Sequence, residues 1–186
     1  MSERRLPGEE GVWLFIIGDL LIFALFFLTF VFYRAGAEPL YLAGQATLNR
    51  TIGLINTLLL LTSSWLVAQS LHRLRAGDGK RARTLLTLGM LGGLGFIALK
   101  IVEYREKFAH GYTVLTNDFY MFYFMFTGIH LIHVVIGLGV LLFLRSVTNR
   151  PEIGASEVRI YESGAAFWHL VDLLWVVLFA LFYLMA

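Results

Sequence analysis

Residues 161–186, YESGAAFWHLVDLLWVVLFALFYLMA, form an apolar stretch that is long enough to cross a membrane and yet contains three ionisable side chains. Glu162, His169 and Asp172 are separated by steps of seven and three residues, which return to almost the same face of an α-helix. A charge at bilayer depth costs roughly 2.5–3.5 kcal/mol even on the mildest insertion scale. We therefore expect one polar stripe that points into protein, with large apolar side chains on the other faces.

The composition of the rest of the chain is that of an integral membrane protein. Of its 186 residues, 58% are hydrophobic and 15% are charged, and the mean hydropathy is +0.73. The chain has no cysteine, which excludes thiolate-held metal centres, disulfides and thiol nucleophiles. The net charge of +2 is small and the basic residues lie in loops, so no nucleic acid is expected as a partner.

Five apolar segments are long enough to cross a hydrocarbon core of roughly 30 Å. They predict an all-α bundle of five transmembrane helices that forms a single domain over residues 1–186. The predicted spans are about 11–34, 51–73, 84–106, 119–145 and 161–185. The first apolar run has no small-residue cleavage site, so it is predicted to be a retained helix rather than a signal peptide.

The positions of lysine and arginine predict the orientation of the bundle. One set of connections is rich in these residues and is predicted to lie inside, which places the N-terminus inside and the C-terminus outside. The predicted inner set is Arg4, Arg5, Arg73, Arg75, Lys80, Arg81, Arg83, Arg145, Arg150 and Arg159, and the predicted outer set is Arg34, Arg50, Arg105 and Lys107.

Polar side chains also occur in the first two spans. Asp19 lies in the middle of the first span, where it is either capped by a hydroxyl or amide of a neighbouring helix or takes part in proton conduction. Asn56 and Ser63 lie seven residues apart on one face of the second span. They are predicted to hydrogen-bond to other helices, since such bonds contribute about 0.6–2 kcal/mol each in membranes.

Glu103 lies toward the outer end of the third span, between Lys100 at i−3 and Lys107 at i+4. Both lysines are within reach of the carboxyl group on a helix, so an ion pair is predicted. The alternative is that Glu103 exchanges protons near the outer leaflet.

His130 and His133 lie three residues apart in the fourth span and are candidate hydrogen-bond partners for the polar stripe of the last span. Two helical histidines supply only two metal ligands, and a haem would need one of them to face His169 across the bundle. Structural histidines, a bound metal and a haem site all remain open on the residues alone. An autonomous haem-binding or proton-translocating membrane protein is the corresponding alternative function.

These residues occur in motifs that resemble subunit III of the haem-copper oxidases. The motifs are Glu162 with Ala165–Trp175 (AAFWHLVDLLW), Thr127–Gly137 (TGIHLIHVVIG), Gly11–Phe15 ahead of Asp19, Leu54–Ser64 (LINTLLLLTSS) and the Glu103-Tyr104 pair. The chain is similar to the five-helix branch, because the two additional N-terminal spans of the seven-helix members are absent. Leu6–Glu9 and Thr116–Met125 most resemble the NorE-type proteins that are associated with nitric oxide reductase.

The resemblance implies an accessory subunit in the bacterial inner membrane. Such a subunit would support the assembly, stability or turnover of a haem-containing catalytic subunit, a nitric oxide reductase or a haem-copper oxidase, and would bind phospholipid in a cleft. It implies no cofactor in this chain, with haem and iron or copper in the partner. Subunit III of a cytochrome c or quinol oxidase is the alternative within the family. Glu103 matches an acidic position that the family links to lipid clefts or proton supply.

Overall fold

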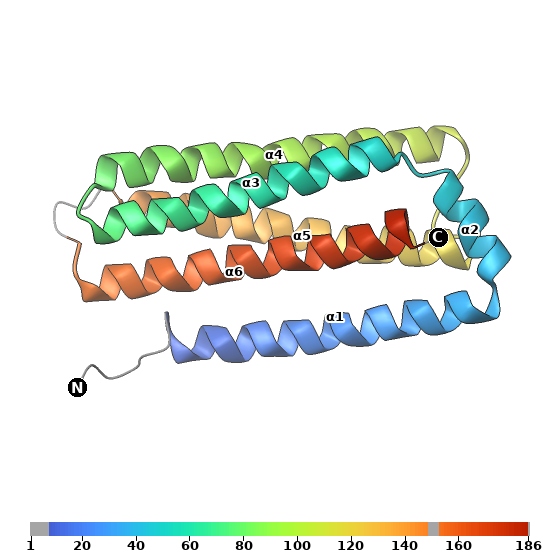
Figure 1. Ribbon diagram of the computed structural model, residues 1–186, viewed down its shortest axis with the longest axis horizontal. Coiled ribbons are helices and arrows are strands. Elements are labelled where there is room, and N and C mark those ends of the chain that lie inside the picture. Colours follow the sequence, from blue (N-terminus) through green and yellow to red (C-terminus); the bar gives the residue numbers. More distant parts are fainter. Residues whose placement is uncertain (1–7, 149–152, 186) are drawn as a thin grey trace.

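The computed structural model describes residues 8–148 and 153–185, and in these ranges the chain is a bundle of long helices (Figure 1). The elements are α1 (Glu10–Gly36), α2 (Glu38–Ala46), α3 (Arg50–Arg75), α4 (Gly79–Ala109), α5 (Asp118–Val147), α6 (Ala155–Phe179) and a π-helical turn, η1 (Ala180–Leu184). Five of these helices, counting α6 with η1 as one, are long and apolar enough to cross a membrane. The predicted all-α fold with five spans is therefore confirmed for the described residues.

Some residues used in the sequence analysis lie outside the described ranges. They are Arg4, Arg5, Leu6, Pro7 and Arg150. The predicted orientation of the bundle and part of the NorE-type resemblance depend on them, so both stay predictions.

Two elements differ from the sequence prediction. The last helix begins at Ala155 rather than near residue 161, and the first connection contains the short helix α2, with Pro39 in its first turn. Hydropathy marks only the part of a helix that lies in hydrocarbon, whereas backbone hydrogen bonding continues into the more polar flanks. At the start of α6 the backbone N–H of Gly154 donates to the carboxylate of Glu157 at 3.2 Å, which satisfies a donor at the helix terminus.

Local sequence signals define the other helix ends. The side chains of Asn49, Asp78 and Asn117 accept hydrogen bonds from backbone N–H groups in the first turns of α3, α4 and α5. Gly77 and Gly111 have positive φ angles of 79° and 80° just after α3 and α4. Such a conformation favours glycine and reverses the chain after a helix.

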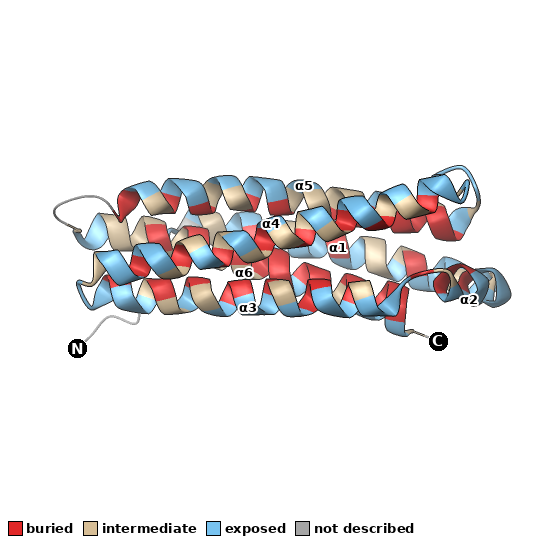
Figure 2. Ribbon diagram, turned by 90° about the horizontal axis from the view of Figure 1, so that it is seen from above, coloured by how far each residue is buried: buried red, intermediate tan, exposed pale blue. Residues whose placement is uncertain are grey.

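The last span, α6 with η1, is the most enclosed helix of the bundle. In its most apolar stretch 67% of the residues are buried, compared with 17% for α1, which lies at one edge of the bundle in Figure 1. Figure 2 colours the helices by burial. Trp168 and Trp175 are fully buried on α6. Glycine makes room for the Trp168 indole, since a Cβ on Gly93 or Gly137 would lie 2.8 or 2.7 Å from its ring atoms. Most of the large apolar side chains of α6 thus pack against other helices, whereas Leu173 is 53% exposed.

The described chain starts and ends at opposite ends of the bundle. The backbone N–H of Gly8 donates to the carboxylate of Glu162, near the start of α6, at 2.8 Å. At the other end the Arg34 guanidinium donates to the backbone carbonyl oxygen of Met185 at 3.0 Å. This arrangement agrees with an odd number of membrane crossings.

Candidate functional site

Polar side chains of α3 and α6 meet along most of the length of the two helices. Most of the groups on α3 are hydroxyls, and those on α6 are aromatic or ionisable. The pairs are Thr57 with Trp175, Ser63 with Trp168, Ser64 with His169, Ser70 with Tyr161 and Arg75 with Glu162. We call these ten residues the α3–α6 seam. Since each pair joins the same two helices, the seam holds α3 and α6 in a defined register.

The predicted polar stripe of the last span contributes to this seam. The carboxylate of Glu162 accepts from Arg75 at 2.7 Å, and Nδ1 of His169 lies 2.5 Å from the hydroxyl oxygen of Ser64. Asp172 is buried next to Ser64, and its Oδ1 has no hydrogen-bond partner among the described residues. The stripe therefore points into protein, toward α3.

The expectation that His130 or His133 partners the stripe is wrong, because both histidines lie on α5 and face other groups. His130 is fully buried, and neither of its ring nitrogens has a hydrogen-bond partner in the described part of the chain. Its imidazole packs against aromatic rings, with centroid distances of 5.5 Å to Phe96 and 5.4 Å to Trp175. Helical spacing identifies the polar face of α6 but not the helix that will cover it.

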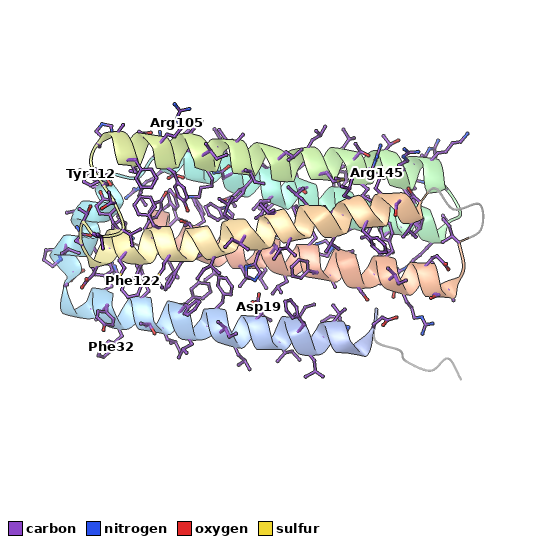
Figure 3. All side chains as sticks on the ribbon, turned by 180° about the vertical axis from the view of Figure 1, so that it is seen from behind. Asp19, Phe32, Arg105, Tyr112, Phe122 and Arg145 are labelled. Carbon is purple, nitrogen blue, oxygen red and sulfur yellow. The ribbon has the colours of Figure 1, made fainter. Side chains whose placement is uncertain are left out.

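His133 instead contacts the carboxyl group of Asp19, which joins α5 to α1. The imidazole Nε2 lies 3.2 Å from Oδ1 of Asp19, and Nδ1 lies 2.9 Å from the carbonyl oxygen of Ile129. A carbonyl oxygen only accepts, so Nδ1 carries a proton and the Nε2–Oδ1 contact shares a further one. The predicted hydroxyl or amide cap of Asp19 is thus an imidazole, and Figure 3 shows Asp19 on the side of α1 that faces the bundle.

The predicted pair of Glu103 with Lys100 is present and is completely enclosed. The Lys100 Nζ donates to Glu103 at 2.8 Å, to the Tyr183 hydroxyl at 3.0 Å and to the Tyr123 hydroxyl at 3.2 Å, and both charged side chains are 0% exposed. The Tyr183 hydroxyl donates to the other carboxylate oxygen of Glu103 at 2.6 Å. The Nζ also lies 4.9 Å from the centre of the Trp175 ring, within the range of cation–π attraction.

Tyr183 of η1 covers the Glu103 carboxylate, which is fully buried. The suggested links of Glu103 to lipid and to proton exchange stay predictions. Lys107, the other candidate partner, donates instead to the backbone carbonyl oxygen of Thr47 at 2.5 Å and lies 3.7 Å from Glu106. The sequence did not predict the two tyrosines of this cluster. Aromatic residues are common in membrane spans, and their pattern does not distinguish a hydrogen-bond partner from a residue that only packs in the core.

The predicted contacts of the second span are only partly present. Ser63 donates to the backbone carbonyl oxygen of Gly89 at 2.6 Å and accepts from Trp168, so it does link helices. Asn56 is also buried, but neither atom of its amide group has a hydrogen-bond partner among the described residues. Its predicted role as an interhelical hydrogen-bonding residue is therefore not seen.

The ionisable and amide residues that the sequence singles out are thus distributed over separate places. Glu162, His169 and Asp172 line the α3–α6 interface, while Asp19 and His133 join α1 to α5. Glu103 lies in the lysine–tyrosine cluster, and Asn56 and His130 are enclosed without hydrogen bonds. Within residues 8–148 and 153–185, no three side chains of the metal-binding types are grouped so that they could hold an ion.

A groove of about 620 Å³ opens between α1, α3 and α6 beside the seam. Its walls are largely apolar and include Leu20 and Leu71, whereas Arg75, Glu162 and His169 add polar atoms. A smaller groove of about 340 Å³ lies on the other side of α1, against α5 and α6. The edge helix α1 is therefore flanked by two openings toward the membrane.

Comparison with known proteins agrees with this architecture. A sequence profile of cytochrome c oxidase subunit III matches residues 8–186. Cytochrome c oxidase subunit 3 of Xenopus laevis is 34% identical over 93% of this chain and 67% of its own length. Cytochrome bo(3) ubiquinol oxidase subunit 3 of Pseudomonas putida is 29% identical over 94% of this chain and 84% of its own length. Quinol oxidase subunit 3 of Bacillus subtilis is 27% identical, with coverages of 99% and 90%. Because the profile extends over all the long helices and their connections, the chain belongs to the cytochrome c oxidase subunit III family.

Proposed function

We propose that the chain is the accessory third subunit of a haem-copper oxidase that uses cytochrome c or a quinol, in a bacterial inner membrane. The observation that carries this proposal is the family match over residues 8–186. The relatives named above are subunits of cytochrome c and quinol oxidases, so this reading has more support than the association with nitric oxide reductase that the motifs suggest.

The geometry supports an accessory role, since most of its intramembrane ionisable groups bind other groups of the same chain. Lys100 binds Glu103, Asp19 binds His133, and His169 binds Ser64. The last two contacts join helices, and Lys100 is joined to other helices through the hydroxyls of Tyr123 and Tyr183. In this proposal the haem and the iron or copper belong to the catalytic subunit. In this proposal the bundle supports the assembly, stability or turnover of that subunit.

Phospholipid is the second partner that we propose. The groove between α1, α3 and α6 has largely apolar walls that suit an acyl chain, and Arg75 at one end offers a cation to a phosphate group. The Arg75 side chain is 49% exposed even though it pairs with Glu162, so a headgroup can reach it.

A nitric oxide reductase is the alternative catalytic partner. It is favoured by the resemblance of Thr116–Met125 to the NorE type, in a segment that the structure places at the start of α5. In that case the chain would support a haem protein whose active site has no copper.

Purification of the affinity-tagged chain from its native membrane tests the proposal. We expect a haem-containing catalytic subunit to be recovered with it, identified by peptide mass spectrometry, with copper in the purified complex. A haem protein with non-haem iron and without copper would transfer the assignment to nitric oxide reductase. A chain that binds haem when purified alone, with the absorption spectrum of bis-histidine coordination, would overturn the accessory role.

A further inference from the structure

One face of α3 points away from the bundle, and its residues are spaced as in a contact between two helices. Its residues follow alternating steps of four and three and are Thr51, Ile55, Leu58, Thr62, Trp65, Gln69 and His72. Gln69 is partly buried and the other six are exposed. A mean repeat of 3.5 residues keeps one face of a helix against a second helix in left-handed packing. We call this face the α3 outer stripe.

Three polar groups of the stripe are expected at the depth of the lipid tails. With the centre of α3 at the bilayer centre, a rise of 1.5 Å per residue places Thr62 about 1 Å, Trp65 about 4 Å and Gln69 about 10 Å from the midplane. The hydrocarbon extends to about 15 Å on each side. Tryptophan in membrane helices is enriched at the interfaces, where its N–H can be hydrated. Trp65 is 60% exposed well inside that boundary.

The hydrogen-bonding capacity of these groups is not used within the described chain. The hydroxyls of Thr29 and Thr84 each donate to the carbonyl oxygen four residues earlier, at 2.8 and 3.1 Å. By contrast, the side chains of Thr62, Trp65 and Gln69 have no hydrogen bond to any residue that the structure describes. Lipid tails offer neither donors nor acceptors, so another protein segment is the environment that would satisfy all three.

The shape of the surface beside the stripe suits a helix. A groove of about 410 Å³ runs between α3 and α4, with Ile55, Leu58 and Thr62 of the stripe on one side and Leu91 and Gly92 on the other. The two helices approach closely there, because a Cβ on Gly92 would lie 3.0 Å from a backbone carbonyl oxygen of α3. Side chains of a neighbouring helix can therefore insert next to the stripe.

We infer that the α3 outer stripe binds a transmembrane helix of the catalytic subunit. This inference rests on the proposed function, which supplies a membrane-embedded partner. The partner helix carries hydroxyl, amide or exposed backbone carbonyl groups opposite Thr62, Trp65 and Gln69. Other outward faces of the bundle present apolar side chains such as Leu21 on α1 and Phe143 on α5, which suit lipid.

Cross-linking from single cysteines tests this contact directly, because the chain has no cysteine of its own. Thr62→Cys and Gln69→Cys place a thiol on the stripe, and Leu21→Cys and Phe143→Cys serve as controls on other lipid-exposed faces. After labelling with benzophenone maleimide and irradiation of the native membrane, we expect covalent adducts with the catalytic subunit from the two stripe positions. Adducts with a second copy of this chain, or with the catalytic subunit only from the control positions, would overturn the inference.

A second experiment measures what the stripe contributes to binding. The triple variant T62V/W65L/Q69L replaces its polar groups with side chains that lipid tolerates, and thermal unfolding of the isolated chain checks that the bundle still folds. We expect the catalytic subunit recovered per tagged chain to fall about tenfold or more, since a buried tryptophan commonly dominates an interface. The aromatic-to-leucine control F143L should stay within about twofold of the wild type.

The two proposals fail in different ways in this experiment. If the wild-type chain recovers no haem protein, the proposed function is wrong and the inference loses its partner. If the wild-type chain recovers the catalytic subunit and the folded triple variant recovers as much, the proposed function stands and the stripe is not the contact.

Discussion

Replacement of Lys100 by methionine tests the enclosed ion pair on α4. The Lys100 Nζ donates to Glu103, Tyr183 and Tyr123 at 2.8, 3.0 and 3.2 Å. Methionine fills a similar volume, so the main loss is electrostatic. The Glu103 carboxylate keeps the hydrogen bond from Tyr183 but remains 0% exposed without its cation. Removal of one partner of a buried ion pair typically costs about 3–5 kcal/mol, and we expect K100M to lower the free energy of unfolding by that amount.

A double-mutant cycle separates the ion pair from the packing around it. E103M alone also leaves a buried charge, whereas K100M/E103M removes both charges. The double variant should therefore lose less unfolding free energy than the two single variants lose together, by at least about 2 kcal/mol. The assay is unfolding in mixed micelles with increasing dodecyl sulfate, followed by tryptophan fluorescence. Lys80→Met, on the exposed first turn of α4, is the control and should change stability by less than about 0.5 kcal/mol. Additive single losses, or a K100M variant as stable as the wild type, would refute the reasoning.

Two further predictions concern packing and the attachment of α1. Gly137→Ala places a Cβ 2.7 Å from the Trp168 ring and should lower the free energy of unfolding by about 1–3 kcal/mol. Gly128→Ala, whose Cβ would have nothing within 4 Å, should be neutral or stabilising by up to about 1 kcal/mol. Equal effects of the two variants would contradict the packing argument. Asp19→Leu and His133→Leu should each increase hydrogen exchange in α1 peptides. The double variant should show no larger increase than either single variant, because both substitutions remove the same contact between α1 and α5. Unchanged exchange in α1 would show that another contact anchors this helix.

The inward orientation of the last span followed from its spacing alone. Glu162, His169 and Asp172 share a helix face, and that face is turned toward α3. Periodicity is a local property of the chain, so it can be read without knowledge of the other helices. The pairing of Glu103 with Lys100 is local in the same sense, since three residues separate them on one helix.

The partners on other helices did not follow from the sequence. His133 was considered for the stripe on α6 but binds Asp19 on α1, and Tyr183 reaches Glu103 across 80 positions of sequence. The contact of Tyr183 with Glu103 also depends on η1, a local change from α- to π-helix that no residue pattern predicts. Contacts of this kind depend on how the helices rotate and approach one another.

The sequence by itself determined that the protein crosses a membrane on five helices and which faces of these helices are polar. Those properties depend on hydropathy and helical spacing, both of which act over a few turns of chain. Only the tertiary structure decided which polar groups meet. Gly93 on α4 and Gly137 on α5 let these helices approach the Trp168 indole of α6 closely. No pattern in the sequence predicts such a fit between residues that are far apart along the chain. The stretch 161–186 therefore predicts a polar face that points into protein, and only the packing of the helices shows that this face contacts α3.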